Sequence, residues 1–137
     1  MFRLDGKTIA VIGAGSGIGQ AVALGVAQQG GHTICLDLDA ANAAATAEMI
    51  ASNGGSADAG AVDIADETSV RDALAHALHH RSGLDGLVCT PAINVRKPIL
   101  KYTGDEFDRV VRVNLRGNFN VLQAEVALAN AKPPLIQ

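Results

Sequence analysis

The stretch that most constrains the fold of this chain runs from Thr8 to Gly19 with the sequence TIAVIGAGSGIG, an apolar run that ends in a cluster of glycines. Apolar residues then recur at helical spacing, from Ile18 through Val22 to Val26. This order predicts a buried strand, a tight turn and the start of a helix. Glycine adopts backbone conformations closed to other residues, and the first turn of a helix presents N–H groups that favour a phosphate. The alternative is a tight turn that binds nothing.

An acidic residue follows the next apolar run. Thr33–Leu36 ends in Asp37, eighteen residues after Gly19. A carboxylate at this place suits the ribose hydroxyls of a dinucleotide. It would also repel a 2′-phosphate, and no Lys or Arg lies in the glycine run or directly after Asp37. These residues favour NAD over NADP, and the alternative role of Asp37 is a solvated strand end.

The rest of the chain alternates strand and helix patterns with short connections. Such alternation predicts an α/β fold with three layers, in which helices cover both faces of a parallel sheet of strand order 3-2-1-4. The expected elements are strand Thr8–Ile12, helix Ser16–Gln29 ending at Gly30-Gly31, strand Thr33–Asp37, helix Ala40–Ala51, strand Ala57–Val62, a helix capped by Asp66 and closed by Gly83, strand Gly86–Thr90, a loop at Pro91–Tyr102, and a long helix that begins with a Thr103–Glu106 capping box, continues to about Asn130 and is ended by Pro133-Pro134.

Composition narrows the class of protein. With 137 residues we expect a single domain, residues 1–137, and the net charge of −3 gives no reason to expect a nucleic-acid partner. No apolar run is long enough to span a membrane, and the charged start of the chain does not suit a signal peptide. Cys35 and Cys89 lie in expected strands rather than in a metal or disulfide spacing, so a reducing, cytoplasmic setting is expected.

The glycine run resembles a known cofactor loop. Gly13, Gly17 and Gly19 fall on the pattern G-x-x-x-G-x-G of the short-chain dehydrogenase/reductase family, and the resemblance extends over about residues 4–125. It implies a Rossmann-like fold and NAD-dependent oxidoreduction of an alcohol or carbonyl. The residues that it places at the cofactor are Gly13, Gly15, Ser16, Gly17, Ile18, Gly19, Asp37, Leu38, Asp63, Ile64, Thr90, Pro91 and Ala92.

Two of these segments follow the third and fourth expected strands. Asp63-Ile64 is similar to the family's Asp–apolar pair, whose carboxylate meets the adenine amino group; an Asp at a strand end also serves simply to enter a helix. The segment from Cys89 to Ala92 stands where the family usually has Asn-Asn-Ala-Gly. Both asparagines are missing, so the side-chain hydrogen bonds that brace this turn must come from elsewhere or be absent, although backbone contact with the ribose is still expected.

The catalytic group of the family is represented by one residue. Asn114 matches its helix asparagine, and a purely structural role for Asn114 is an equal expectation. The family's Ser and Tyr-x-x-x-Lys are not found. Tyr102 is the single tyrosine, it precedes Asn114, and Glu106 rather than a lysine follows it at the fourth place.

Two clusters of polar residues have weaker claims. His76 and His80 are spaced to share a helix face, with His79 beside them, but two imidazoles make a poor metal site, and a solvated face is the expectation. The basic residues Arg109, Arg112 and Arg116 form a helical stripe near Arg96, Lys97 and Lys101. We expect a solvated stripe there too, with a phosphate or an acidic partner as the alternative.

The sequence is therefore interpreted as the dinucleotide-binding half of a short-chain dehydrogenase/reductase, truncated after the helix that follows the fourth strand. Three hypotheses remain open: a nucleotide-binding module without catalysis of its own, an oxidoreductase completed by a partner chain, and an interaction protein that keeps only the fold. Because the fourth strand and the long helix would lack neighbours, a homo-oligomer joined through the strand edge, the long helix or both is expected. The alternative is a helix that folds back over the edge of the fourth strand.

Overall fold

A computed structural model describes residues 2–130 and shows a parallel sheet between two layers of helices. Strand β1 pairs with β2 on one side and β4 on the other, and β3 pairs with β2, so the strand order is β3-β2-β1-β4 as predicted. The elements are β1 (Thr8–Ile12), α1 (Gly17–Gln28), β2 (His32–Asp37), α2 (Ala40–Ser52), β3 (Ser56–Ala61), α3 (Glu67–Ala77), β4 (Gly86–Cys89), a 3-10 turn (Ile99–Lys101), α4 (Gly104–Val111), a π-helical segment (Arg112–Gly117) and α5 (Asn118–Asn130).

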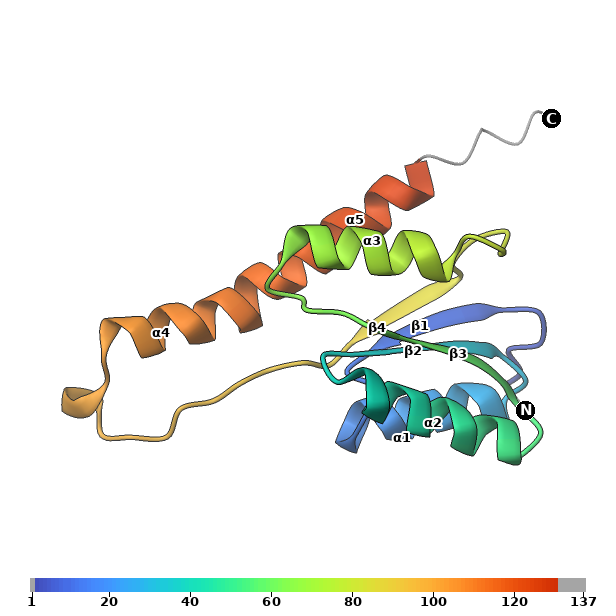
Figure 1. Cartoon of the computed structure of the whole chain (residues 1–137), viewed down its shortest axis with the longest axis horizontal. Coiled ribbons are helices and arrows are strands. Elements are labelled where there is room, and N and C mark those ends of the chain that lie inside the picture. The colour runs from blue at the N-terminus through green and yellow to red at the C-terminus, as the bar shows by residue number, and fades with distance from the viewer. Residues whose placement is uncertain (1, 131–137) are drawn as a thin grey trace.

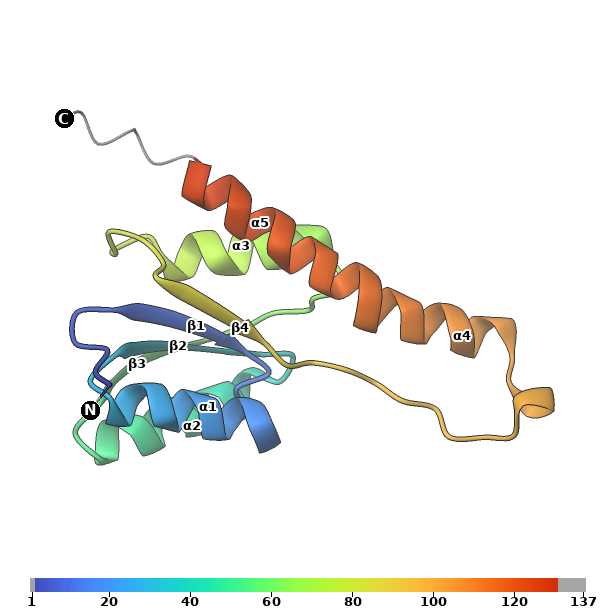
Figure 2. The ribbon, with the colours of Figure 1, turned by 180° about the vertical axis from the view of Figure 1, so that it is seen from behind.

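Each face of the sheet is covered by a different helix pair. Helices α1 and α2 lie on one face, and α3 and α5 on the other (Figures 1 and 2). Side chains alternate between the faces of a strand, so β2 sends Ile34 and Leu36 into the core beneath α3 and Cys35 into the core beneath α1 and α2. This double burial explains why β1 and β2 read as nearly continuous apolar runs, whereas β3 at the edge of the sheet does not.

The chain leaves the body of the fold after β4. Residues 90–103 extend away from the sheet to α4, and the π-helical segment and α5 bring the chain back beside α3 (Figure 1). The capping box expected at the start of this helix is present, because Thr103 Oγ1 accepts from the Glu106 N–H at 3.2 Å and Glu106 accepts from the Thr103 N–H at 3.0 Å. The expected long helix is nevertheless not uniform, because the π-helical segment Arg112–Gly117 separates α4 from α5. The sequence did not predict this segment.

Several expected boundaries were wrong. Helix α3 ends at Ala77 with Leu78 as its C-cap, so Gly83 does not close it and lies in the turn that follows. Strand β1 has the predicted bounds Thr8–Ile12, and the long helix begins at Gly104 after its capping box and continues to Asn130, as expected. The remaining strands and helices differ from their expected bounds by one residue at one or both ends. The proline pair Pro133-Pro134 lies outside the described residues. No helix within residues 2–130 is long and apolar enough to cross a membrane.

Candidate dinucleotide site

The glycine run forms the turn from β1 into α1. Gly13 and Gly17 have positive φ angles of 85° and 54°, which side chains strongly disfavour. A Cβ on Gly19 would collide with the carbonyl oxygen of Gly13, so the first turn of α1 packs directly against the end of β1. At Gly17 nothing lies within 4 Å of the place of a Cβ. The turn therefore offers open space against backbone at the start of a helix, the geometry that a pyrophosphate requires.

Three exposed side chains at or near this turn make little contribution to the folded chain. Ser16 is the N-cap of α1, yet its side chain makes no capping hydrogen bond. Ile18, in the first turn of α1, is 76% exposed, and Leu38, between β2 and α2, is 75% exposed. An apolar side chain at such exposure gains little in the folded chain. These residues suit contact with a bound molecule.

Asp37 joins the glycine turn to the end of β2. Its Oδ2 accepts a hydrogen bond from the Gly15 N–H at 2.8 Å, and its Oδ1 accepts from the Asp39 N–H at 3.0 Å. A Cβ on Gly15 would lie 2.7 Å from Asp37 Oδ2, so the two segments are in direct contact. The structure brings together the glycines and the carboxylate that the sequence places eighteen residues after Gly19.

A buried hydrogen bond from α2 supports the glycine turn, and it was not predicted from the sequence. Thr46 on α2 is fully buried, and its Oγ1 donates to the carbonyl oxygen of Ala14 at 2.9 Å. The Gln20 side chain on α1 donates in turn to Thr46 Oγ1 at 3.1 Å. A threonine within the alanine-rich stretch Ala40–Ala51 was the one available signal, because a buried hydroxyl needs a partner.

Thr90 replaces the missing asparagine at the end of β4. Its Oγ1 donates to the Ile12 carbonyl oxygen at 3.0 Å, and its backbone N–H donates to the same oxygen at 3.0 Å. Pro91 follows against Gly13, and Ala92 is exposed. From the sequence alone, the hydrogen bonds of this turn could come from another side chain or be absent. The structure shows that the Thr90 hydroxyl supplies one.

Asp63 and Ile64 connect β3 to α3. Asp63 is exposed, and its Oδ1 accepts from the Ala65 N–H at 2.9 Å, a local turn that leads toward the Asp66 cap of α3. Ile64 is buried in the core beneath α3. The pair lies at the carboxyl edge of the sheet, where ligands of open α/β folds bind.

Asn114 lies in the π-helical segment and grips the loop that follows β4. Its Oδ1 accepts from the Ile93 N–H at 2.8 Å and its Nδ2 donates to the Ile93 carbonyl at 2.9 Å. The partner that a half-buried amide requires is thus a backbone amide of residues 90–103. Tyr102 lies at the far end of this segment, after the 3-10 turn, and Glu106 contacts Lys97 there.

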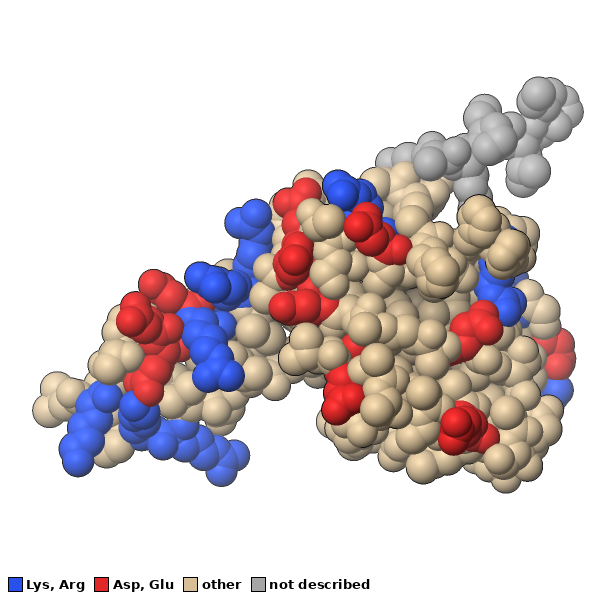
Figure 3. All heavy atoms as spheres, viewed as in Figure 1, with Lys and Arg blue, Asp and Glu red and all other residues tan. Residues whose placement is uncertain are grey.

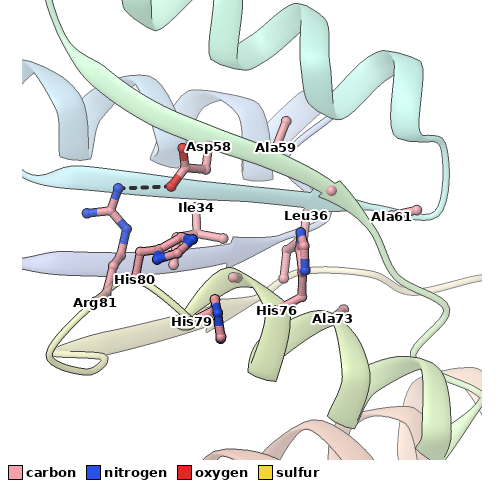
Figure 4. Close-up of a pocket in the computed structure, with 12 residues that line it drawn as sticks. Ile34, Leu36, Asp58, Ala59, Ala61, Ala73, His76, His79, His80 and Arg81 are labelled. Atoms are coloured by element: carbon pink, nitrogen blue, oxygen red, sulfur yellow. Dashed lines mark hydrogen bonds and ion pairs between the residues drawn. The ribbon is translucent and has the colours of Figure 1, made fainter.

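The histidines line a separate groove (Figure 4). It has a volume of roughly 630 Å³ between β3 and α3, and no residue expected at the cofactor lines it. His76 lies in α3, but His79 and His80 lie in the turn beyond it, so the expectation of one shared helix face was wrong. On the β3 side, Arg81 pairs with Asp58 at 2.9 Å.

The basic residues gather on the extended part of the molecule. Figure 3 shows Lys and Arg side chains over residues 90–103 and α4, apart from the sheet. Arg116 of the stripe is exposed, as a solvated stripe predicts, and its Nε also donates to Asn120 Oδ1 at 3.2 Å, with its guanidinium 5.9 Å from the Phe119 ring centre. Nearby, Lys97 pairs with Glu106. Arg109 and Arg112 are exposed.

The sheet order and the glycine turn together define a Rossmann-like α/β protein. Residues 7–132 match the family described as short chain dehydrogenase, and the chain belongs to this family. The versicolorin reductase stcU of Emericella nidulans is 37% identical over 124 residues, which are 88% of this chain and 46% of that protein. The sorbitol dehydrogenase of Cereibacter sphaeroides is 34% identical over 89% of this chain and 46% of its own length.

Solved structures of dehydrogenases have a similar fold. The gluconate 5-dehydrogenase of Burkholderia cenocepacia J2315, in complex with NADP and tartrate, superposes with a TM-score of 0.84 at 34% identity, covering 91% of this chain and 49% of that one. A short chain dehydrogenase from Mycobacterium avium gives a TM-score of 0.88 at 29% identity, with 94% and 48% covered. The chain spans about half the length of the relatives it matches.

Proposed function

We propose that this chain is the NAD(P)-binding half of an oxidoreductase that acts on an alcohol or carbonyl. The observation that carries the proposal is the contact between the open glycine turn and the Asp37 carboxylate, which accepts from the Gly15 N–H at 2.8 Å. Phosphate-binding backbone and a ribose-binding acid, adjacent at the carboxyl edge of a parallel sheet, are what a dinucleotide needs. Membership of the short chain dehydrogenase family supports the same conclusion.

Each part of the dinucleotide has candidate contacts. The pyrophosphate would lie on the turn from Gly13 to Gly19, and the adenine ribose on Asp37 beside Leu38. The Asp63 carboxylate would meet the adenine, with Ile64, whose side chain is buried, facing it through its backbone. The backbone from Thr90 to Ala92 would meet the other ribose. The positive φ angles of the turn and the exposure of Ser16, Ile18 and Leu38 support this placement.

We further propose that NAD binds more tightly than NADP. The Asp37 carboxylate stands beside the turn, and no Lys or Arg follows it directly to offset its charge against a 2′-phosphate. The gluconate 5-dehydrogenase relative holds NADP, so family membership alone does not decide the preference. The choice rests on Asp37.

We propose that the 137-residue chain binds a dinucleotide without turning it over. Its single tyrosine, Tyr102, is followed at the fourth place by Glu106, and Asn114 is engaged with the Ile93 backbone. Completion of the active site by a partner chain, and an interaction protein that keeps only the fold, are the rival functions. Both cysteines are free, which suits a reducing, cytoplasmic setting. Burial raises the pKa of Cys35 to about 11 and also raises that of Cys89, so neither thiol readily forms the reactive thiolate.

A second copy of the chain is the partner that we propose. Large apolar side chains lie exposed along α4 and α5 and the segment between them, and exposed apolar surface of this kind favours an interface. They are Phe107, Leu115, Phe119, Leu122 and Val126. Among the described residues, the outer edge of β4 pairs with no strand. Light scattering at micromolar concentration tests this, and a strict monomer would contradict it.

Calorimetric titration of the chain with ADP-ribose tests the proposed function. Saturable binding at one site is expected, and a replacement of Gly17 should abolish it. Absence of binding would favour the interaction protein. Dinucleotide-dependent turnover of an alcohol panel by the purified chain, unchanged by Tyr102→Phe and surviving a contaminant control, would favour completion of the site between chains.

A further inference from the structure

A buried amide on α5 forms hydrogen bonds with two other parts of the chain. Asn120 is 3% exposed, its Nδ2 donates to the Ile64 carbonyl oxygen at 2.9 Å, and its Oδ1 accepts from Arg116 Nε at 3.2 Å. The amide orientation is determined by these partners, since one end faces an acceptor and the other a donor. Because a buried polar group without a partner is costly, this arrangement constrains Ile64 as much as Asn120.

The helix also touches the side chain of Ile64. A Cβ on Gly117 would lie 2.7 Å from both Cγ1 and Cδ1 of Ile64, so the backbone of the π-helical segment approaches as closely as a glycine allows. Ile64 is 4% exposed. The same residue is therefore held twice, by packing against Gly117 and by the hydrogen bond from Asn120.

The segment that is held leads to the edge of the site. Asp63 precedes Ile64, and its exposed carboxylate is oriented by one local bond, from the Ala65 N–H at 2.9 Å. The position of this carboxylate thus depends on the backbone of residues 63–65. Asn120 fixes that backbone at its central carbonyl.

Resting on the proposed function, we infer that Asn120 is a positioning residue that, by holding the Ile64 backbone, keeps the Asp63 carboxylate where it meets the adenine. Asn114, earlier on the same helical stretch, holds Ile93 in the loop after β4. One stretch of helix thereby supports the loops at the carboxyl ends of both β3 and β4. Asn120 acts through Ile64 and touches no ligand itself.

The test compares two ligands that differ in one group. Nicotinamide hypoxanthine dinucleotide lacks the adenine amino group that Asp63 would accept from, so the ratio of its Kd to that of NAD measures the contact. In Asn120→Leu, of similar volume but without a donor, we expect this ratio to fall roughly three- to ten-fold toward one, the effect of one hydrogen bond. Exchange of the Ala65 amide hydrogen should also become faster. Loss of stability alone would not change the ratio.

Two further variants complete the design. Gly117→Ala presses on Ile64 from the other contact and should lower the ratio as well, which keeps the test decisive if Asn120→Leu folds poorly. Gln123→Leu, an exposed position on α5, is the matched control and should leave the ratio unchanged. NAD binding with an unchanged ratio in Asn120→Leu and Gly117→Ala would overturn this inference alone. Failure of the unaltered chain to bind NAD would overturn the proposed function as well.

Discussion

The Oγ1 of Thr90 donates a hydrogen bond to the carbonyl oxygen of Ile12, 3.0 Å away, and so joins the ends of two neighbouring strands. A Cβ on Gly13, the next residue after Ile12, would collide with this hydroxyl. The threonine thus fills the space under the glycine turn.

Thr90→Val keeps the shape and removes the hydroxyl. The Ile12 oxygen still accepts from the backbone N–H of residue 90, so the free energy of unfolding should fall by only about 0.5–1.5 kcal/mol. Urea denaturation measures the change, and Thr90→Ser, which keeps the hydroxyl, should lose less. A larger loss in the serine variant would show that the methyl group, not the hydrogen bond, supports the turn.

Gly17→Val tests the glycine turn. A β-branched residue at a φ of 54° costs about 1–3 kcal/mol and projects into the open space where a phosphate would lie. We expect ADP-ribose binding to disappear in calorimetry while circular dichroism stays that of a folded chain. Gly25→Val in the middle of α1, where φ is ordinary and nothing lies within 4 Å, is the matched control. Equal affinity in both variants would place the phosphate elsewhere.

Asp37→Asn tests the choice of dinucleotide. The unaltered chain should bind NAD at least about ten-fold more tightly than NADP, a difference of about 1.4 kcal/mol. The asparagine keeps an oxygen for the Gly15 N–H but removes the charge, so the preference should narrow, as calorimetry with both ligands would record. Asp39→Asn, which removes a neighbouring charge at the N-cap of α2, should leave the preference for NAD over NADP unchanged. Equal binding of NAD and NADP by the unaltered chain would contradict the proposal.

The edge of the sheet makes stability depend on pH. His32 on β2 contacts Ser56 Oγ at 2.6 Å through Nδ1 and Asp58 Oδ2 at 3.0 Å through Nε2, and Asp58 also pairs with Arg81. Burial and the charge of Arg81 lower the pKa of His32, although Asp58 opposes the shift. The folded state therefore takes up a proton on His32 less readily than the unfolded chain does.

The sign of the effect follows from this difference. The stability that His32 contributes is present above about pH 6.5, the ordinary histidine pKa, and is lost as the pH falls through the lower pKa of the folded state. Urea denaturation between pH 8 and pH 5 should show a falling free energy of unfolding. In His32→Gln the fall over this range should be shallower. An equally steep fall in that variant would assign the pH dependence to other groups.

The glycine turn and the capped helix starts were predictable because their causes are local. Asp66 and Thr103 were recognisable as caps from their neighbours, and each caps the helix that follows, as Asp39 also does at the start of α2. The end of α3 was missed because its last turn competes with the turn at residues 78–83. Periodicity continues through Leu78, but it does not state where backbone hydrogen bonding stops.

By itself the sequence determined the alternation of strands and helices, the strand order 3-2-1-4 and the place of the glycine turn, because short apolar periods and right-handed crossovers leave few other arrangements. Tertiary structure alone decided which side chains support that turn and the connection from β3 to α3. The bond from Thr90 to Ile12 spans 78 residues, and the bond from Asn120 to Ile64 spans 56. Such pairs form only where the packed sheet and its helices bring distant backbone carbonyls within reach of a buried donor, and no local pattern in the sequence encodes that meeting.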